Sequence, residues 1–239
     1  MWSVFKKELR QFSSNLTGYI AIILFLLING VFLFVLPESS ILDYGFASLD
    51  KFFELAPWVL LFLVPAISMR SLSDEFKAGT FEILKTKPLT SWQIVLGKYV
   101  AILIVLIIVI VPTGIYVITI GSLSTTNIDS GGIAGSYIGL FMLAAVFAAI
   151  SICCSSFTSN AVVAFLSSAF VCLLLYFGFT AISKINYFQG SADYYIEMLG
   201  IDFHYRSISR GVLDSRDIIY FGSIIFFSLM ITEKNVHSK

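Results

Sequence analysis

Charged residues are scarce in this sequence. Only 13% of its 239 residues are Asp, Glu, Lys or Arg, about half of the roughly 25% that is usual in soluble domains. Fifteen basic residues balance fifteen acidic ones, so the chain lacks the excess of positive charge that binds nucleic acid. Apolar residues make up 58% of the chain, and the mean hydropathy is +0.91. These proportions are typical of a protein that crosses a membrane several times.

Motifs for catalysis and for metal binding are also missing from the sequence. The single Gly-Lys pair lies at residues 97–98, and Trp92 stands where a phosphate-binding loop needs its first glycine. His204 and His237 are the two histidines, and neither has a cluster of neighbouring ligand residues. We therefore expect no enzyme, no metal site and no bound cofactor. Any energy that the protein uses must come from another chain.

Six segments are long or apolar enough to cross a bilayer, for which a helix needs about 20 residues. We expect an all-α integral membrane protein, a single domain over residues 1–239, with spans at about 17–36, 55–72, 96–121, 135–156, 160–182 and 217–232. In the third span, Pro112 and Gly114 are expected to bend the helix. In the fourth, Gly135 and Gly139 begin a series of small residues at four-residue spacing, which predicts close helix packing.

The distribution of basic residues predicts the orientation. With the amino terminus inside and six crossings, ten Lys and Arg fall in the inner segments and five in the outer ones. Short cytoplasmic loops carry such an excess of positive charge. We therefore expect both termini in the cytoplasm.

The first residues of the chain form an amphipathic pattern. Trp2, Phe5, Leu9 and Phe12 recur every three or four residues, and basic and polar side chains take the opposite side. This pattern predicts a helix that lies in the membrane interface before the first span. The alternative is a plain cytoplasmic extension of that span, but the division into an aromatic and a basic side favours the surface helix.

A charged stretch between the second and third spans interrupts the hydrophobic sequence. Gly79 is expected to end a helix that continues from the second span, because glycine tolerates the left-handed conformation. A short helix is expected from Thr80 to Lys85. The sequence of residues 90–93, Thr-Ser-Trp-Gln, is a capping-box pattern that starts the next helix.

We expect this short helix to present an exposed apolar pair, Phe81 and Leu84, to a soluble partner. The charged side chains nearby, including Glu75 and Glu82, are expected to face water. The alternative is a solvated loop whose charges only set the topology.

The charged stretch has a distinctive order of residues: Glu75, Gly79, Thr80, Phe81, Glu82, Leu84, Pro88, Leu89, Gly97 and Lys98. This order resembles the cytoplasmic loop of the ABC-2 family of ABC transporter permeases, which carries a coupling helix that docks on the ATP-binding subunit. The resemblance implies that Phe81 and Leu84 are docking contacts, and that the loop is shaped by Glu75, Gly79, Thr80, Glu82 and Pro88. It also implies that the amphipathic start is the family's elbow helix.

The segment before the last span, residues 203–217, also has a recognisable pattern. Gly211 suits the end of a helix, and Asp214 or Asp217 can cap the sixth span. Together with Arg210, these residues resemble the corresponding segment in a subset of ABC-2 permeases that includes the gliding-motility-associated permease GldF. In the wider family this region holds short re-entrant helices at the outer end of the pathway.

The resemblance implies the permease subunit of an ABC-2 type transporter in the inner membrane of a bacterium. Such a subunit couples ATP hydrolysis by a separate ATPase to transport or to gliding-motility machinery. The implied partners are a GldA-type ATP-binding subunit, which uses the ATP and Mg²⁺, and a second membrane subunit of the GldG type; the lipid bilayer surrounds both membrane subunits. The alternative is a membrane-embedded scaffold or force-coupling subunit that moves no solute.

Overall fold

The computed structural model describes residues 1–14, 16–36, 49–85, 89–123, 129–185, 193–211 and 214–238. Within these ranges the chain is helical apart from short connections. The α-helices are α1 (Trp2–Ser14), α2 (Leu16–Phe34), α3 (Asp50–Ser68), α4 (Arg70–Lys77), α5 (Thr80–Lys85), α6 (Ser91–Ile110), α7 (Gly114–Leu123), α8 (Ser130–Phe157), α9 (Ala161–Leu173), α10 (Phe179–Ser183), α11 (Asp193–Glu197), α12 (Ile201–Ile208) and α13 (Ser215–Ser238). A 3₁₀ turn, η1 (Val111–Thr113), joins α6 to α7, and a π-helical turn, η2 (Leu174–Gly178), joins α9 to α10.

Five helical stretches of the described chain are long and apolar enough to cross a membrane. They are Asp50–Lys77, Ser91–Ser122, Ser130–Phe157, Ala161–Ser183 and Ser215–Ser238, and they match the second to sixth predicted spans. The predicted first span corresponds to α2, which meets the same standard only together with α1 as a pair bent by 66°. The prediction of an all-helical membrane protein is confirmed, with five spans or, counting the bent pair, six.

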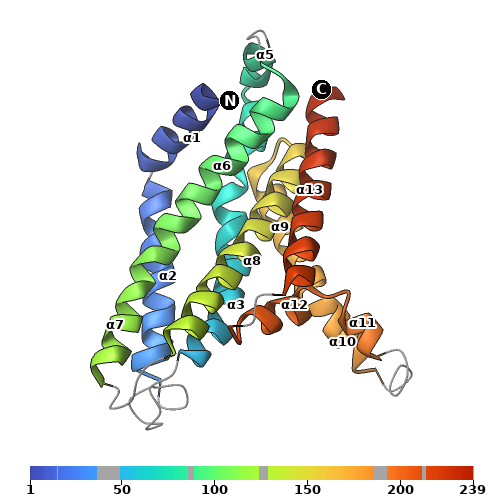
Figure 1. Ribbon diagram of the computed structural model, residues 1–239. Helices are drawn as coiled ribbons and strands as arrows, with labels where there is room; N and C mark the ends of the chain where they lie inside the picture. Colours follow the sequence, from blue (N-terminus) through green and yellow to red (C-terminus); the bar gives the residue numbers. More distant parts are fainter. Residues whose placement is uncertain are drawn as a thin grey trace.

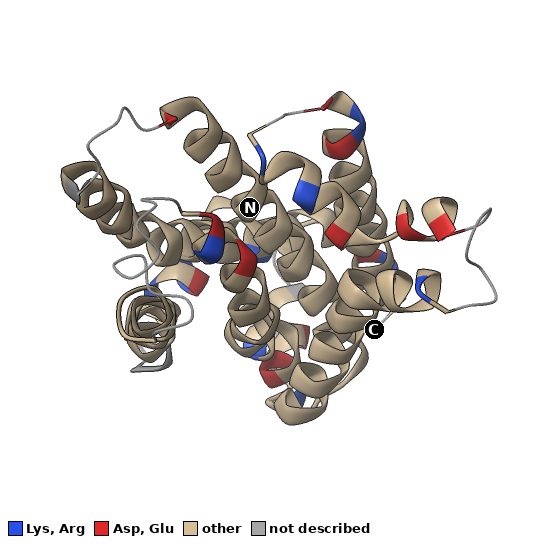
Figure 2. Ribbon diagram, turned by 90° about the horizontal axis from the view of Figure 1, so that it is seen from below, with Lys and Arg blue, Asp and Glu red and all other residues tan. Residues whose placement is uncertain are grey.

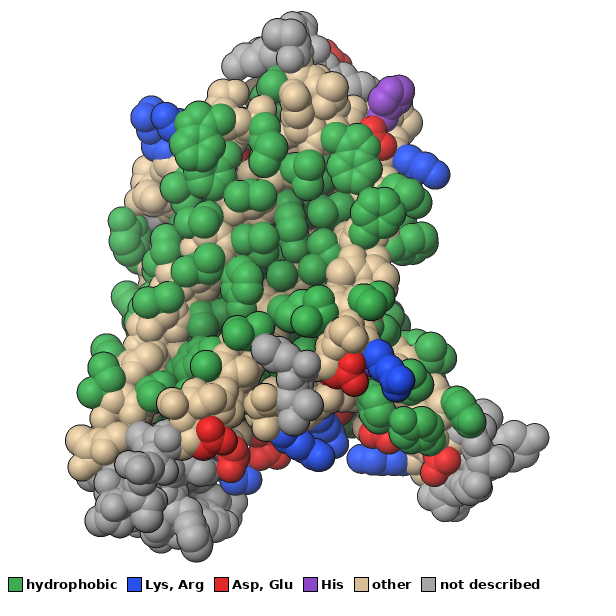
Figure 3. Space-filling model, viewed as in Figure 1, with side chains coloured by type: hydrophobic (Ala, Val, Ile, Leu, Met, Phe, Trp, Pro, Cys, Tyr) green, Lys and Arg blue, Asp and Glu red, His purple; other side chains and the backbone are tan. Residues whose placement is uncertain are grey.

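The two ends of the bundle carry different parts of the chain. Both termini and α5 lie at one end, here called the terminal end, whereas α7 and α11 lie at the other (Figure 1). On the face shown in Figure 3, hydrophobic side chains fill the middle and charged side chains gather toward the two ends. Seen from the end opposite the termini, most of the ribbon is tan, the colour of residues other than Lys, Arg, Asp and Glu (Figure 2). A bilayer fits around such a band, and which end faces the cytoplasm stays a prediction.

Helix α8 is the central element of the bundle. It packs against α3, α6, α9, α12 and α13. Of its most apolar 18-residue stretch, 72% is buried. Its predicted small residues explain this position: Gly135 and Gly139 are buried, as are Ala144, Ala145, Ala148 and Ala149. Apolar side chains gain little by leaving lipid for another apolar surface, so membrane helices associate through such close backbone contacts. The prediction of close packing at this helix is confirmed.

The predicted glycine turn and capping box are present, and the helix geometry changes at the proline where a bend was expected. Gly79 follows α4 with a φ of +65°, a conformation that glycine adopts without steric cost. Thr90 accepts a hydrogen bond from the backbone N–H of Gln93, and the Gln93 side chain accepts one from the backbone of Thr90, which completes the predicted capping box. The helix changes to 3₁₀ geometry at Pro112, since proline has no N–H to continue the α-helical ladder.

Candidate functional site

The junction of α3 and α4 is held by a side chain from another helix. The backbone N–H groups of Leu72 and Ser73 donate to Ser155 Oγ at 3.2 and 3.1 Å. The same hydroxyl donates to the carbonyl of Met69 at 3.0 Å. A side chain inserted into the helical ladder is a recognised cause of a helix break. Ser155 lies on α8 and is fully buried, so this contact fixes the start of α4 to the central helix.

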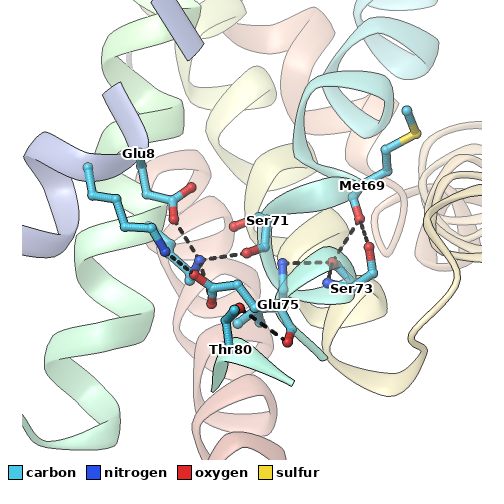
Figure 4. Close-up of polar contacts among 10 residues, drawn as sticks. Glu8, Met69, Ser71, Ser73, Glu75 and Thr80 are labelled. Carbon is cyan, nitrogen blue, oxygen red and sulfur yellow. Dashed lines mark hydrogen bonds and ion pairs between the residues drawn. The ribbon is translucent and has the colours of Figure 1, made fainter. Parts of the chain in front are cut away.

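A buried ionic cluster joins α4 to two further helices. Lys98 on α6 has no exposed side-chain surface. Its ammonium lies 2.7 Å from Glu8 Oε1 on α1 and 3.0 Å from Glu75 Oε2 on α4, and it donates to the carbonyl of Ser71 at 2.6 Å. Lys7 completes the cluster with an ion pair of 2.6 Å to Glu75 Oε1. Figure 4 shows Glu8, Ser71 and Glu75 converging from α1 and α4.

The charges of this cluster cancel, since two lysines face two glutamates. A charge buried without a partner is strongly unfavourable. The fully buried ammonium of Lys98 therefore depends on carboxylates from both α1 and α4, and this favours the packing of those two helices on α6. The expectation that Glu75 faces water is wrong: this residue is 9% exposed, and its carboxylate contacts two ammonium groups.

The amphipathic helix α1 packs along α6. A side chain at Gly97 would come within 3.2 Å of Val4 Cβ and 3.1 Å of the Met1 carbonyl, so glycine is what allows the close approach that brings Glu8 to Lys98. Trp2 is 66% exposed and stacks on Phe5.

The remaining predicted residues of this helix, Leu9 and Phe12, are partly buried against the core. The Phe12 ring lies close to Gly18 at the start of α2, where an added Cβ would be 2.5 Å from Phe12 Cε1. Whether α1 lies in the membrane interface stays a prediction.

The short helix α5 is attached to α4 by an aromatic contact. The rings of Phe76 and Phe81 meet edge to face with their centroids 4.9 Å apart. The Thr80 hydroxyl lies 3.5 Å from the Glu75 carbonyl, which it faces as a hydrogen-bond donor. Phe81 is 4% exposed and Leu84 is 8% exposed, so the expectation that this pair is exposed is wrong.

Polar and small residues form the outer surface of the α4–α5 turn. The exposed residues are Lys77, Ala78, Gly79, Thr80 and Glu82. Glu82 thus faces solvent as expected. Pro88 lies outside the described residues.

Sequence reasoning missed Lys98 and Ser155 as members of the site. Lys98 looks like an ordinary boundary charge, because it stands immediately before a long uncharged run. Ser155 gave no signal, because a serine in a membrane helix usually bonds to its own or a neighbouring backbone.

At the opposite end of the bundle, the predicted outer-loop residues are mostly structural. Gly211 follows α12 with a φ of +82°, and a side chain on it would come within 2.6 Å of Gly132 Cα. A Cβ on Gly139 would lie 2.6 Å from Ile208 Cγ2, and Ser136 donates to the carbonyl of Ser209 at 2.7 Å. These contacts seat the end of α12 on the small residues of α8.

The two aspartates of the outer motif have separate roles. Asp214 caps α13, because its Oδ1 accepts from the backbone N–H of Arg216 at 3.0 Å. Asp217 is buried, and its Oδ1 lies 2.7 Å from His204 Nδ1. The other ring nitrogen of His204 lies 2.9 Å from the Met198 carbonyl. His204 thus joins α12 to α13 through a single carboxylate contact.

Helix α12 is also tied to α3. The Tyr205 hydroxyl donates to the carbonyl of Phe53 at 2.8 Å. Burial, with smaller contributions from Tyr176 and Asp202, raises the pKa of Tyr205 well above its ordinary value. The hydroxyl therefore keeps its proton and remains a donor in this contact.

One face of α3 is uncovered along its whole length, as far as the first residue of α4. Every fourth residue is exposed, in the series Asp50, Glu54, Trp58, Phe62, Ala66 and Arg70. All six line cavities. The largest of these, about 580 Å³, runs beside α2, α3 and α6 and is apolar except near the terminal end, where Arg70, Glu8 and Gln11 contribute. The series is acidic at one end, apolar in the middle and basic at the other.

The comparisons with known proteins agree with this architecture. A family model described as "ABC-2 family transporter protein" matches residues 2–196, which is more than half of the 239-residue chain. The match runs from α1 into α11 and includes the α4–α5 turn. A search of curated proteins gives no match. The chain therefore belongs to the ABC-2 family of transporter proteins, as a multi-pass membrane subunit.

Proposed function

We propose that this chain is the permease subunit of an ABC-2 type ABC transporter, and that its α4–α5 turn receives a separate ATP-binding subunit. The observation that carries the proposal is the position of α4. Phe76 attaches α5 to it, Ser155 attaches it to α8, and Glu75 attaches it to α1 and α6. A force on α5 would reach three other helices through buried contacts, which is what transmission from an ATPase requires.

The exposed surface of the turn is the contact that we assign to the ATPase. Lys77 and Glu82 offer one charge of each sign on this surface, and charged groups at an interface favour a specific partner and orientation. Phe81 and Leu84 are buried within the chain, so we assign to them the attachment of α5 rather than direct docking. ATP and Mg²⁺ belong to the partner subunit.

The uncovered face of α3 supports a role as one wall of a pathway. Its middle part is apolar and lines the 580 Å³ cavity, while charged residues stand at both ends. One chain supplies one wall only, so a second membrane subunit must close the path. The resemblance to GldF favours a GldG-type subunit in that place and a GldA-type ATPase at the turn. It also favours the inner membrane of a gliding bacterium, with the terminal end of the bundle in the cytoplasm.

A charge-reversal experiment tests the docking surface. The chain is co-expressed with the ATP-binding subunit that a neighbouring gene with Walker motifs encodes, and the complex is purified through a tag on the permease. We expect Lys77→Glu combined with Glu82→Lys to reduce the co-purified ATPase by roughly tenfold, which corresponds to about 1.4 kcal/mol. Lys51→Glu, an exposed change at the opposite end, is the matched control. ATPase yields that are equal for all three proteins would show that the turn is not the docking surface.

The scaffold alternative makes a different prediction for the assembled complex. Purified complex in liposomes should hydrolyse ATP and move a solute or lipid in one direction if the chain is a permease. Hydrolysis without any directional movement across a broad set of candidate substrates would favour a force-coupling subunit of a motility complex.

A further inference from the structure

The outer end of the uncovered α3 face opens into a second cavity of different chemistry. This cavity, about 560 Å³, is lined by residues of α3, η2 and α12 and by the two residues that follow α12. Its aromatic wall includes Trp58, Tyr176 and Phe177, and the Trp58 and Tyr176 rings meet edge to face at 5.7 Å. Charged side chains of both signs complete the lining. It therefore differs from the 580 Å³ cavity, whose middle part is apolar.

Trp58 connects the two cavities. It lines the 580 Å³ cavity and the 560 Å³ cavity, which we call the outer cavity. It also lines a smaller cavity of about 290 Å³, which shares Glu54 with the outer cavity. A ligand lying along α3 would thus meet the apolar 580 Å³ cavity, here called the channel, on one side of the Trp58 indole. On the other side it would meet the charged and aromatic outer cavity, here called the charged chamber. A wholly apolar molecule would leave the charged chamber unsatisfied, and a wholly polar one would lose its hydration in the channel.

The charges of the outer cavity specify the polar part of the ligand. Arg206 is bound to Asp202 through two contacts, of 2.8 and 3.1 Å. Arg210 is exposed, and the described residues supply no ion-pair partner for its guanidinium. A guanidinium in this setting suits a phosphate, to which it can present two parallel N–H donors.

A carboxylate and aromatic rings lie on the α3 side of the same cavity. Glu54 is 73% exposed, and its contact with Lys51 is an exposed pair of 3.2 Å, a type that contributes little to stability. An ammonium group placed near Glu54 would also lie close to the faces of Trp58 and Phe177, which attract cations. Phosphate and ammonium together describe a zwitterionic headgroup.

We propose that the α3 face binds a phospholipid with an amine headgroup. The phosphate of this lipid contacts Arg210, and its ammonium group contacts Glu54. Its acyl chain lies in the apolar channel on the other side of Trp58. This site gives a role to Arg210, the one residue of the outer motif that holds no structural contact through its side chain among the described residues. The site stands whether or not the chain docks an ATPase.

Quenching of Trp58 fluorescence by lipids with brominated acyl chains tests this site directly. Trp2→Phe and Trp92→Phe leave Trp58 as the only tryptophan of the full chain. The detergent-solubilised protein is titrated with three brominated lipids that differ only in headgroup: phosphatidylethanolamine, phosphatidylglycerol and diacylglycerol. We expect saturable quenching in which phosphatidylethanolamine binds most tightly, and diacylglycerol most weakly.

Headgroup variants complete the test. Arg210→Gln should weaken binding of phosphatidylethanolamine by about tenfold, as expected for one lost charge-assisted contact, and Glu54→Gln should abolish its advantage over phosphatidylglycerol. Arg216→Gln, an exposed change at the same end that lines none of the three cavities, should change neither. Thermal melts of each variant check that the fold is kept.

Two results would overturn the proposal. Quenching that rises without saturation and equally for all three lipids would mean that only surrounding lipid reaches Trp58. Saturable quenching that Arg210→Gln leaves unchanged would refute the headgroup assignment. The assay contains no ATPase, so neither result can be confused with failure of docking at the α4–α5 turn.

Discussion

The ionic cluster of Lys98, Glu8, Glu75 and Lys7, here called the transmission unit, joins α1, α4 and α6. A single substitution of Lys98 tests whether it holds these helices together. Lys98→Met keeps an unbranched side chain, shorter by one heavy atom, and removes its charge. Glu75 would still have Lys7, but the described residues offer Glu8 no other ion pair. Removing one partner of a buried ion pair costs about 3–5 kcal/mol. For a chain of this size, 1 kcal/mol corresponds to about 2–4 °C in Tm, so we expect Lys98→Met to lower Tm by roughly 6–20 °C.

The assay is thermal unfolding in detergent, followed by tryptophan fluorescence. Lys51→Met is the matched control, because Lys51 pairs with Glu54 at 3.2 Å on the exposed surface, where such a pair is worth about 0–1 kcal/mol. Adding Glu8→Gln to Lys98→Met should recover part of the lost stability, since it removes the carboxylate left without its partner. If Lys98→Met lowers Tm no more than Lys51→Met does, the cluster does not hold the three helices together.

Three further substitutions probe the contacts around this unit and at the opposite end. Gly79→Ala should destabilise the chain by about 1–2 kcal/mol, because Gly79 has a positive φ. The control, Gly114→Ala, lies in a helix with open space around it and should be neutral or stabilising. Equal Tm values for the two variants would contradict the assigned turn. Ser155→Ala should cost about 1–3 kcal/mol by leaving two buried N–H groups unsatisfied, measured by the same melt and contradicted by an unchanged Tm. His204→Phe should cost about 3–5 kcal/mol by leaving the Asp217 carboxylate unpaired, and combining it with Asp217→Leu should recover most of that loss; a double mutant no more stable than the single one would refute the pair.

Local sequence patterns predicted local structure well. Gly79, the capping box at Thr90 and the small residues of α8 were each predictable, because a conformational preference or a spacing of a few residues determines them. The spans were predictable for the same reason, since apolar length decides whether a helix can cross the bilayer. The first span was the exception, because α2 reaches the length and hydropathy of a membrane span only together with α1, from which it is bent.

Contacts between distant residues were not predictable from these patterns. Glu8, Glu75 and Lys98 are far apart in the sequence, and only the packing of three helices brings them together. Periodicity placed Phe81 and Leu84 on one face of α5, but it could not show that this face turns toward the chain itself. The functional interpretation changes accordingly, from an apolar docking pair to a polar surface held in place by that pair.

Labelling at position 82 tests most directly whether the α4–α5 turn faces the cytoplasm and contacts an ATPase. Glu82→Cys is introduced after Cys153, Cys154 and Cys172 have been replaced by serine, with Glu54→Cys as the control at the opposite end. In intact cells, a membrane-impermeant maleimide should label the cysteine at position 54 and not the one at position 82. Inverted vesicles should show the reverse, and added ATP-binding subunit should protect position 82. Labelling of position 82 from outside intact cells would contradict both the orientation and the proposed role of the turn.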